Sequence, residues 1–281
     1  MLLELAIGDA YGAGFEYANE MVEKYNDLSH YIQHPRHFGV WPGRYTDDTQ
    51  MSIAIAELIV EQCAWTTLEI ATKFIEVFKR DPREGYSVRF YHFLQETNDG
   101  RNFLENINPD SEKSGAAMRA TPIGIYPSIP EVIEKCTIQA AVTHNTENGI
   151  KAACAAALAS HYFIYNLGPK AELQAFLESH LPGNMWSYTL PQKVKSKGWM
   201  SVRAAIIAVM RNDHTSTLLK DCVDFCGDVD TVATIALAAA SCSNEYVNDL
   251  PQHLLDCLEN GDYGREYLID LNSKLFELKD H

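Results

Sequence analysis

Apolar residues recur at helical spacing along almost the whole of this chain. Met51, Ala54, Ile55, Leu58 and Ile59 all fall on one side of a helix. Alternation of apolar and polar residues, the pattern of a half-buried strand, is scarce. The sequence therefore predicts an all-α fold, in which helices bury their apolar faces against one another.

The stretch Gly149–Tyr165 is rich in alanine and apolar nearly all the way round, which is typical of a helix at the centre of a bundle. Three long irregular segments, 19–45, 100–127 and 181–198, are expected to have functional roles. No linker or repeat divides the chain, so we expect one compact domain over residues 1–281. Further helices are expected at Leu68–Arg80 after a Thr66 cap, from Ser87 to Asp99, and at Ser201–Arg211, Thr215–Cys226, Thr231–Ser243, Pro251–Glu259 and Gly264–Leu278.

Composition narrows the classes of function. Of the 281 residues 46% are hydrophobic, enough for a sizeable core, and the formal net charge of −15 argues against direct binding to nucleic acid. Seven cysteines without regular spacing indicate reduced thiols and a cytoplasmic protein. The sequence lacks a basic leader and a long apolar run, so neither export nor a membrane span is expected. Pro35 interrupts the trio His30, His34 and His37, which we assign to a solvated loop.

Two acidic clusters stand directly before helical segments. The first contains Thr46, Asp47 and Asp48, and the second contains Asp228, Asp230 and Thr231. Thr46 has the position of a helix N-cap, and carboxylates at a helix start are favoured by the helix dipole. The second helix is too apolar to begin in open solvent, so its acids are expected to be partly buried.

Simple helix capping and a metal site are both compatible with these clusters. Capping requires one such residue, whereas each cluster carries two carboxylates and a hydroxyl. If the clusters converge, four negative charges meet, and hard divalent cations such as Mg²⁺ or Mn²⁺ are their natural partners. From spacing alone the two interpretations are about equally supported.

The chain also resembles a known family, the ADP-ribosylglycohydrolases, along nearly its whole length. No single motif is decisive, but many occur in the family's order. They are Gly8 to Gly12 with Glu16, Tyr45 to Met51, Ser114 to Arg119 with Pro122 to Gly124, Thr143-His144, Gly198-Trp199, and Gly227 to Thr231.

The resemblance implies an all-α bundle with two Mg²⁺ ions between the helix starts, Mn²⁺ being an alternative. It also implies catalytic roles for Glu16 and Asp48. The metal ligands that it implies are Thr46, Asp47, Asp48, Asp228, Asp230 and Thr231. The residues that it places against ADP-ribose are Ser114, Gly115, Ala116, Ala117, Met118, His144 and Trp199.

The activity implied is hydrolysis of the bond at ribose C1″, which removes ADP-ribose from a modified protein or a small conjugate, with an arginine linkage favoured. Alternatives are an ADP-ribosylserine or O-acetyl-ADP-ribose hydrolase, or a non-catalytic, crystallin-like member of the same fold. Ser114, Trp199 and Cys226 depart from the family's usual residues and put the linkage in doubt. An isoprenoid synthase is a further alternative, but Met51 stands where that chemistry needs a third acid.

Overall fold

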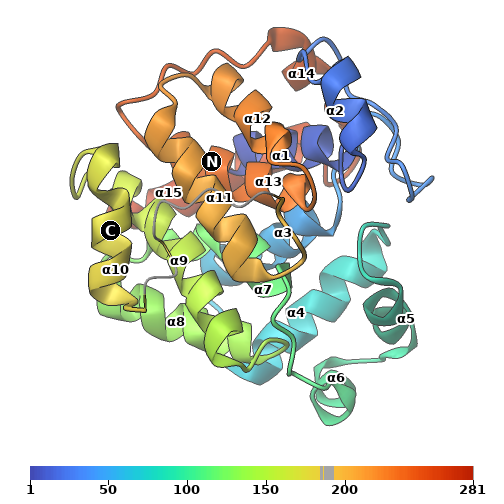
Figure 1. Ribbon diagram of the computed structural model, residues 1–281. Helices are drawn as coiled ribbons and strands as arrows, with labels where there is room; N and C mark the ends of the chain where they lie inside the picture. Colours follow the sequence, from blue (N-terminus) through green and yellow to red (C-terminus); the bar gives the residue numbers. More distant parts are fainter. Residues whose placement is uncertain (184–185, 187–192, 281) are drawn as a thin grey trace.

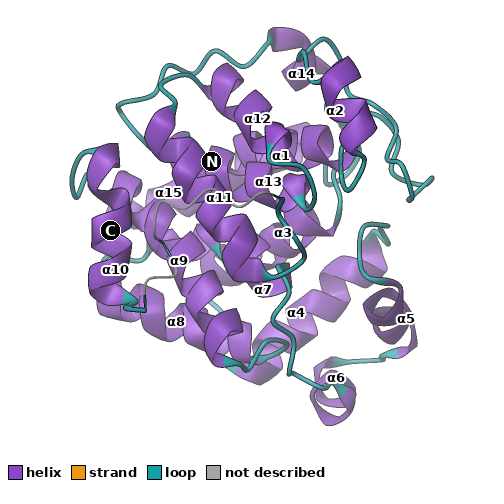
Figure 2. Cartoon of the chain, in the orientation of Figure 1, coloured by secondary structure: helices purple, strands orange, loops and turns teal. Residues whose placement is uncertain are grey.

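The computed structural model describes residues 1–183, 186 and 193–280 and is built from α-helices joined by loops (Figure 2). Within these residues no β-sheet forms, and isolated bridges such as that between Val194 and Gly227 tie loops together. The predicted all-α class is confirmed. The helices not introduced below are α2 (Asn19–Tyr25), α10 (Leu173–His180), α12 (Thr215–Asp224) and α14 (Gln252–Cys257), with 3₁₀ turns η2 (Lys170–Glu172) and η3 (Leu278–Asp280).

Helices α1 (Leu2–Ala13) and α13 (Val229–Ala240) pack closely at the centre of the molecule (Figure 1). Glycines permit this approach. A Cβ on Gly8 would lie 2.6 Å from the carbonyl oxygen of Ala233, and one on Gly12 would lie 2.5 Å from the Cα of Asp230. The two glycines thus allow the end of α1 to lie against the acidic start of α13, a close backbone approach that a side chain at either position would prevent.

The predicted central helix is α9 (Glu147–Ile164), capped by the Thr146 side chain, which accepts from the backbone N–H of Gly149. Its residues from Ala152 to Ile164 are all buried. It packs against α7 (Gly115–Met118), α8 (Ile129–Ala141), α11 (Gly198–Arg211) and the 3₁₀ turn η1 (Thr121–Ile125). The prediction of a buried central helix is confirmed.

Helix α3 (Asp47–Val60) lies between α4 (Thr67–Arg80) and α15 (Arg265–Glu277). Thr46 and Thr66 are the N-caps of α3 and α4, as predicted: their side chains accept from the N–H groups of Asp48 and Glu69. None of the described helices combines the length and the apolarity needed to cross a bilayer.

Several predicted boundaries are wrong. The helix expected from Ser87 to Asp99 ends at Glu96 as α5 (Val88–Glu96), because the Asp99 side chain accepts from Asn102 N–H and starts a new helix, α6 (Gly100–Asn106). The segment 100–127, expected to be irregular, contains α6, α7 and η1, and the segment 19–45 contains α2. Of the third irregular segment, 181–198, residues 184–185 and 187–192 fall outside the described residues.

Candidate functional site

The structure brings the two acidic clusters together at the floor of one cavity of about 830 Å³. Asp47 and Asp48 from the start of α3 line it beside Asp228, Asp230 and Thr231 from the start of α13. The Asp48 and Thr231 side chains lie next to each other, so the two turns are in contact. The expected burial is also found, since Asp228 and Asp230 are only 6% and 7% exposed.

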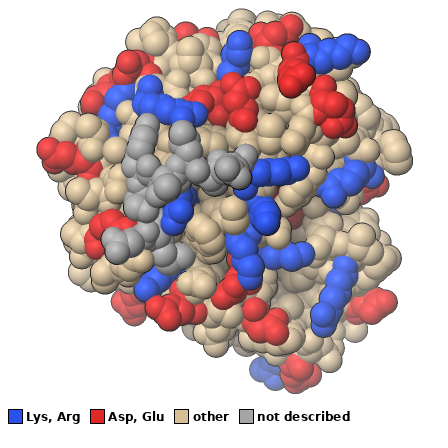
Figure 3. Space-filling model, viewed as in Figure 1, with Lys and Arg blue, Asp and Glu red and all other residues tan. Residues whose placement is uncertain are grey.

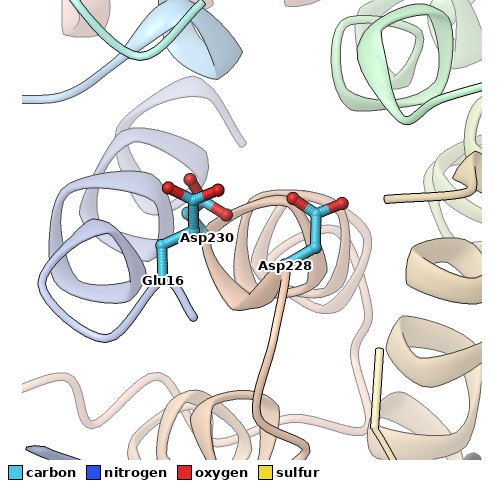
Figure 4. A group of neighbouring side chains, drawn as sticks. All are labelled: Glu16, Asp228 and Asp230. Carbon is cyan, nitrogen blue, oxygen red and sulfur yellow. The ribbon is translucent and has the colours of Figure 1, made fainter. Parts of the chain in front are cut away.

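Glu16, in the turn after α1, completes this acidic group. One carboxylate oxygen each from Glu16, Asp228 and Asp230 lies within 4.8 Å of the others. Figure 4 shows the Glu16 and Asp230 carboxylates close together, with Asp228 beside them at the start of α13. The turn that carries Glu16 is fixed against the segment before α13, because the N–H of Tyr17 donates to the carbonyl of Gly227 at 2.8 Å.

Asp9 anchors the first cluster, a role that was not predicted. This fully buried carboxylate accepts four hydrogen bonds, from the N–H (2.9 Å) and hydroxyl (2.7 Å) of Thr46 and from the N–H (2.9 Å) and hydroxyl (2.6 Å) of Thr49. Burial raises the pKa of Asp9 despite these bonds. The Thr46 hydroxyl donates its proton to Asp9, so it offers a lone pair, and no donor, to a cation. An acid beyond the first turn of a mostly apolar helix is the signal that could have marked Asp9 as buried, although it does not indicate the partners.

The electrostatics of the group favour a cation. Burial raises the pKa of Asp228 to about 6, with a further contribution from the charge of Glu16. The pKa values of Asp47, Asp48 and Asp230 are raised further by the same two causes, burial first and neighbouring carboxylates second.

One buried oxygen of Asp48, Oδ2, has no hydrogen-bond partner within the described residues. In the same part of the chain no Lys, Arg or His nitrogen lies within ion-pair distance of the four aspartates. Buried charges need compensation, and an all-oxygen set of carboxylates and hydroxyls suits a hard divalent cation. The donor set therefore fits the predicted metal chemistry.

Residues predicted to bind ADP-ribose are divided between the cavity wall and the core behind it. Ser114, Gly115, Met118 and His144 line the cavity, whereas Ala116 and Ala117 are buried within α7. Gly115 packs closely on His144, since a Cβ there would lie 3.1 Å from Cε1 of His144 and would require a small shift of the ring.

Trp199 does not line the cavity as far as the chain is described. It sits partly buried on α11, with the Arg203 guanidinium 4.8 Å from its ring centroid. Its predicted contact with ADP-ribose gains no support from this position.

A chain of hydrogen bonds fixes the protonation of His144. The buried Arg119, which can only donate, gives a hydrogen bond to Thr143 Oγ1 at 2.8 Å. Thr143 Oγ1 lies 2.7 Å from His144 Nδ1, and because the hydroxyl already accepts from Arg119 and has no other acceptor among the described residues, its proton is assigned to the bond with Nδ1. Burial, aided by the charges of Arg119 and Lys113, lowers the pKa of His144 to about 3. His144 is therefore neutral and carries its proton on Nε2, a buried donor without a partner in the described part of the protein.

The cavity has a basic and aromatic rim above its acidic floor. Arg36, Arg89, Lys113 and Lys197 line it, together with Asp110, Glu112 and aromatic residues of α5 and the preceding loop, and Lys197 is ion-paired with Glu112. Figure 3 shows Lys and Arg side chains gathered around the centre of one face, although the chain is acidic overall. A positive rim over a negative floor suits a ligand that carries phosphate groups and is held below through a metal.

The histidine trio is not uniformly solvated, so that assignment is wrong for His34. His30 is exposed and His37 half-buried, but His34 is 1% exposed and its Nε2 lies 3.0 Å from Glu16 Oε2. Pro35 does break any helix here, as expected. The loop nevertheless folds inward against the acidic group, which local sequence does not reveal.

Comparison with known proteins supports one family. The family model for ADP-ribosylglycohydrolase matches residues 1–281. ADP-ribosylhydrolase ARH3 of Xenopus tropicalis is 31% identical over 144 residues, which are 48% of this chain and 41% of that protein. The chain thus spans less than half of that relative's length.

Two bacterial relatives align over more of the chain. ADP-ribosylarginine hydrolase Tri1 of Pseudomonas putida is 23% identical over 84% of this chain and 67% of that protein. ADP-ribosyl-[dinitrogen reductase] glycohydrolase of Rhodospirillum rubrum is 25% identical over 92% of this chain and 88% of that protein. A solved structure described as an ADP-ribosylglycohydrolase-related protein complex shares the fold, with a TM-score of 0.71 at 22% identity over 99% of this chain and 96% of that chain. This chain belongs to the ADP-ribosylglycohydrolase family.

Proposed function

We propose that this protein is an Mg²⁺-dependent hydrolase that cleaves the glycosidic bond at ribose C1″ and releases ADP-ribose from a modified protein or a small conjugate. The observation that carries the proposal is the group of buried, mutually repelling carboxylates at the floor of a cavity with a basic rim. The cavity volume falls within the range of pockets that hold small-molecule ligands. The expected compartment is the cytoplasm.

Two Mg²⁺ ions, or Mn²⁺ in their place, are proposed to bind between the helix starts of α3 and α13. When bound, they would supply the positive charge that orients the ribose hydroxyls and acidifies a water. The unpartnered oxygen of Asp48 and the close oxygens of Asp228 and Asp230 support this assignment. The proposed ligands are Thr46, Asp47, Asp48, Asp228, Asp230 and Thr231.

Glu16 and Asp48 are the proposed catalytic carboxylates. Glu16 is proposed to accept a proton from the attacking water, because it lines the cavity and is only half-buried, whereas Asp48 is buried. Asp48 also lines the cavity, and a bound cation would keep this buried carboxylate charged beside the reacting sugar.

The opposite wall is proposed to hold the diphosphate and ribose of ADP-ribose. His144 presents an Nε2–H donor without an internal partner, and a phosphate oxygen would satisfy it. Ser114, Gly115 and Met118 lie next to it on the cavity wall. Ala116 and Ala117 shape this turn from behind, and any role of Trp199 is indirect in this arrangement.

An arginine linkage is the favoured substrate, and the name of the Pseudomonas putida relative supports it. The test is release of ADP-ribose from peptides modified on arginine or serine and from O-acetyl-ADP-ribose, each with Mg²⁺ and with EDTA. We expect Mg²⁺-dependent release that is abolished in the double variant Asp47→Ala, Asp230→Ala and kept in the surface control Asp262→Asn. Undiminished release by the double variant would refute the assignment, and metal binding without any release would indicate a crystallin-like protein.

A further inference from the structure

His34 lies against Glu16 in a way that the proposed chemistry does not yet use. Its side chain is fully buried, and Nδ1 accepts hydrogen bonds from the backbone N–H groups of Arg36 (3.0 Å) and His37 (3.1 Å). Two donors directed at Nδ1 require a lone pair on that nitrogen. The ring proton of His34 is therefore on Nε2.

The Nε2–H group faces Glu16. Nε2 lies 3.0 Å from Glu16 Oε2, but the N–H is not aligned well enough for a standard hydrogen bond, and no other partner occurs in the described chain. A buried donor left without an acceptor is costly, so rotation of the Glu16 carboxylate toward His34 is favoured. Arg36, with a nitrogen 3.7 Å from the same oxygen, holds the carboxylate from the solvent side.

The surrounding backbone makes this contact specific. A Cβ on Gly14 would lie 2.3 Å from the Ile32 side chain, so the 32–37 segment is pressed against the end of α1. The His37 ring packs edge-on against His34, with centroids 4.8 Å apart. His34 thus has one ring position, and its proton has one carboxylate within reach.

We infer that His34 is a positioning residue: its Nε2–H, with Nε2 3.0 Å from Glu16 Oε2, attracts the Glu16 carboxylate and keeps it beside Asp228 and Asp230. The inference deepens the proposed function and rests on its metal site. Glu16 has a long, flexible side chain, and without His34 it can turn toward solvent. Partners that orient ligands in this way typically change metal affinity 10–100-fold when they are removed.

Two substitutions separate the roles of the two ring nitrogens. In His34→Asn the amide oxygen can replace Nδ1 and keep the bonds to the Arg36 and His37 amides, but no donor reaches Glu16. In His34→Gln the longer side chain can place an amide N–H near the position of Nε2. The measurement is Mn²⁺ binding to the metal-free proteins by electron paramagnetic resonance, without substrate, with thermal unfolding of each variant as the check on folding.

We expect His34→Asn to weaken Mn²⁺ binding about 10-fold and His34→Gln to stay within about 3-fold of the wild type. Equal affinities in all three proteins, equal losses in both variants, or a larger loss in His34→Gln would overturn the inference. Failure of the wild type to bind Mn²⁺ would instead overturn the proposed function. The two failures are therefore distinguishable in one experiment.

Discussion

Replacing Asp228 with asparagine should stabilise the metal-free protein at neutral pH while removing its response to metal. Asp228 is buried, and its pKa rises from the ordinary value of 3.8 to about 6, chiefly through burial and then through the charge of Glu16. Asparagine resembles the protonated acid and can still accept the hydrogen bond from Ser201 Oγ, which is 2.9 Å long. The variant therefore loses the charge and keeps the shape.

The direction of this change in the free energy of unfolding follows from proton linkage. Because the folded pKa is raised, the folded state holds its proton more tightly than the unfolded state, and stability falls as the pH rises from about 4 to about 6. With pKa values of 3.8 and about 6, the penalty on the folded state is about 3 kcal/mol at pH 7.5 and about 1 kcal/mol at pH 4.5. Asp228→Asn should gain these amounts, and for a chain of this size the larger one raises Tm by about 5 °C.

The assay is urea and thermal unfolding of wild type and variant at pH 4.5 and 7.5, in EDTA and in saturating Mg²⁺. At a metal concentration of 100 Kd the wild type should gain about 2.7 kcal/mol, and the variant much less. Asp262→Asn, on the exposed surface, is the control for the general effect of removing one charge from an acidic protein. A variant no more stable than wild type in EDTA at pH 7.5, or a gain that is larger at pH 4.5, would refute the reasoning.

Three further substitutions test the surrounding structure. Gly12→Ala should lower stability by about 1–3 kcal/mol in urea unfolding through overpacking against α13, whereas Gly261→Ala, with open space around its Cβ, should stay within about 0.5 kcal/mol; equal effects would count against the close approach. Thr143→Val should weaken ADP-ribose binding about 10-fold in calorimetry, or about 1.4 kcal/mol, because it removes the hydroxyl that fixes the His144 tautomer. Thr143→Ser keeps the hydroxyl and should bind ADP-ribose like the wild type. Unchanged binding in Thr143→Val would contradict the hydrogen-bond chain from Arg119 to His144. Cys226→Gly should raise stability by about 0.5–1 kcal/mol because Cys226 has a φ of +58°, with Cys226→Ala unchanged as the control for the thiol; no gain would show that the backbone is relaxed there.

Features that depend on neighbouring residues could be predicted from the sequence. Thr46 caps α3 because a hydroxyl before an apolar run is a helix start, and the alanine-rich stretch before Tyr165 forms a buried helix because of its composition. The convergence of the acidic turns was implied by the family resemblance, whereas their spacing alone was equally compatible with simple helix capping.

Features that depend on contacts between distant parts of the chain could not be predicted from the sequence. Asp9 receives its four hydrogen bonds from a turn that begins 37 residues later, and no local pattern indicates them. His34 sits in a loop, as Pro35 indicates, but its burial depends on contact with Glu16 and not on its neighbours in sequence. Similarly, the motif that contains Trp199 does not determine toward which side of α11 the ring points.

Contacts that need no metal hold the acidic group together. The carboxylates therefore keep repelling one another in the metal-free protein. Gly8 and Gly12 fix the start of α13 against α1, and the four bonds to Asp9 fix the start of α3 against the same helix. One short helix therefore serves as the common support for both acidic turns. Because that support is built from backbone contacts and buried hydrogen bonds, repulsion among the carboxylates cannot be relieved by separating them. The repulsion can still be relieved by proton uptake at low pH or by binding of a divalent cation at neutral pH. The stability of the metal-free protein as a function of pH therefore distinguishes a cation site from an ordinary pair of helix caps.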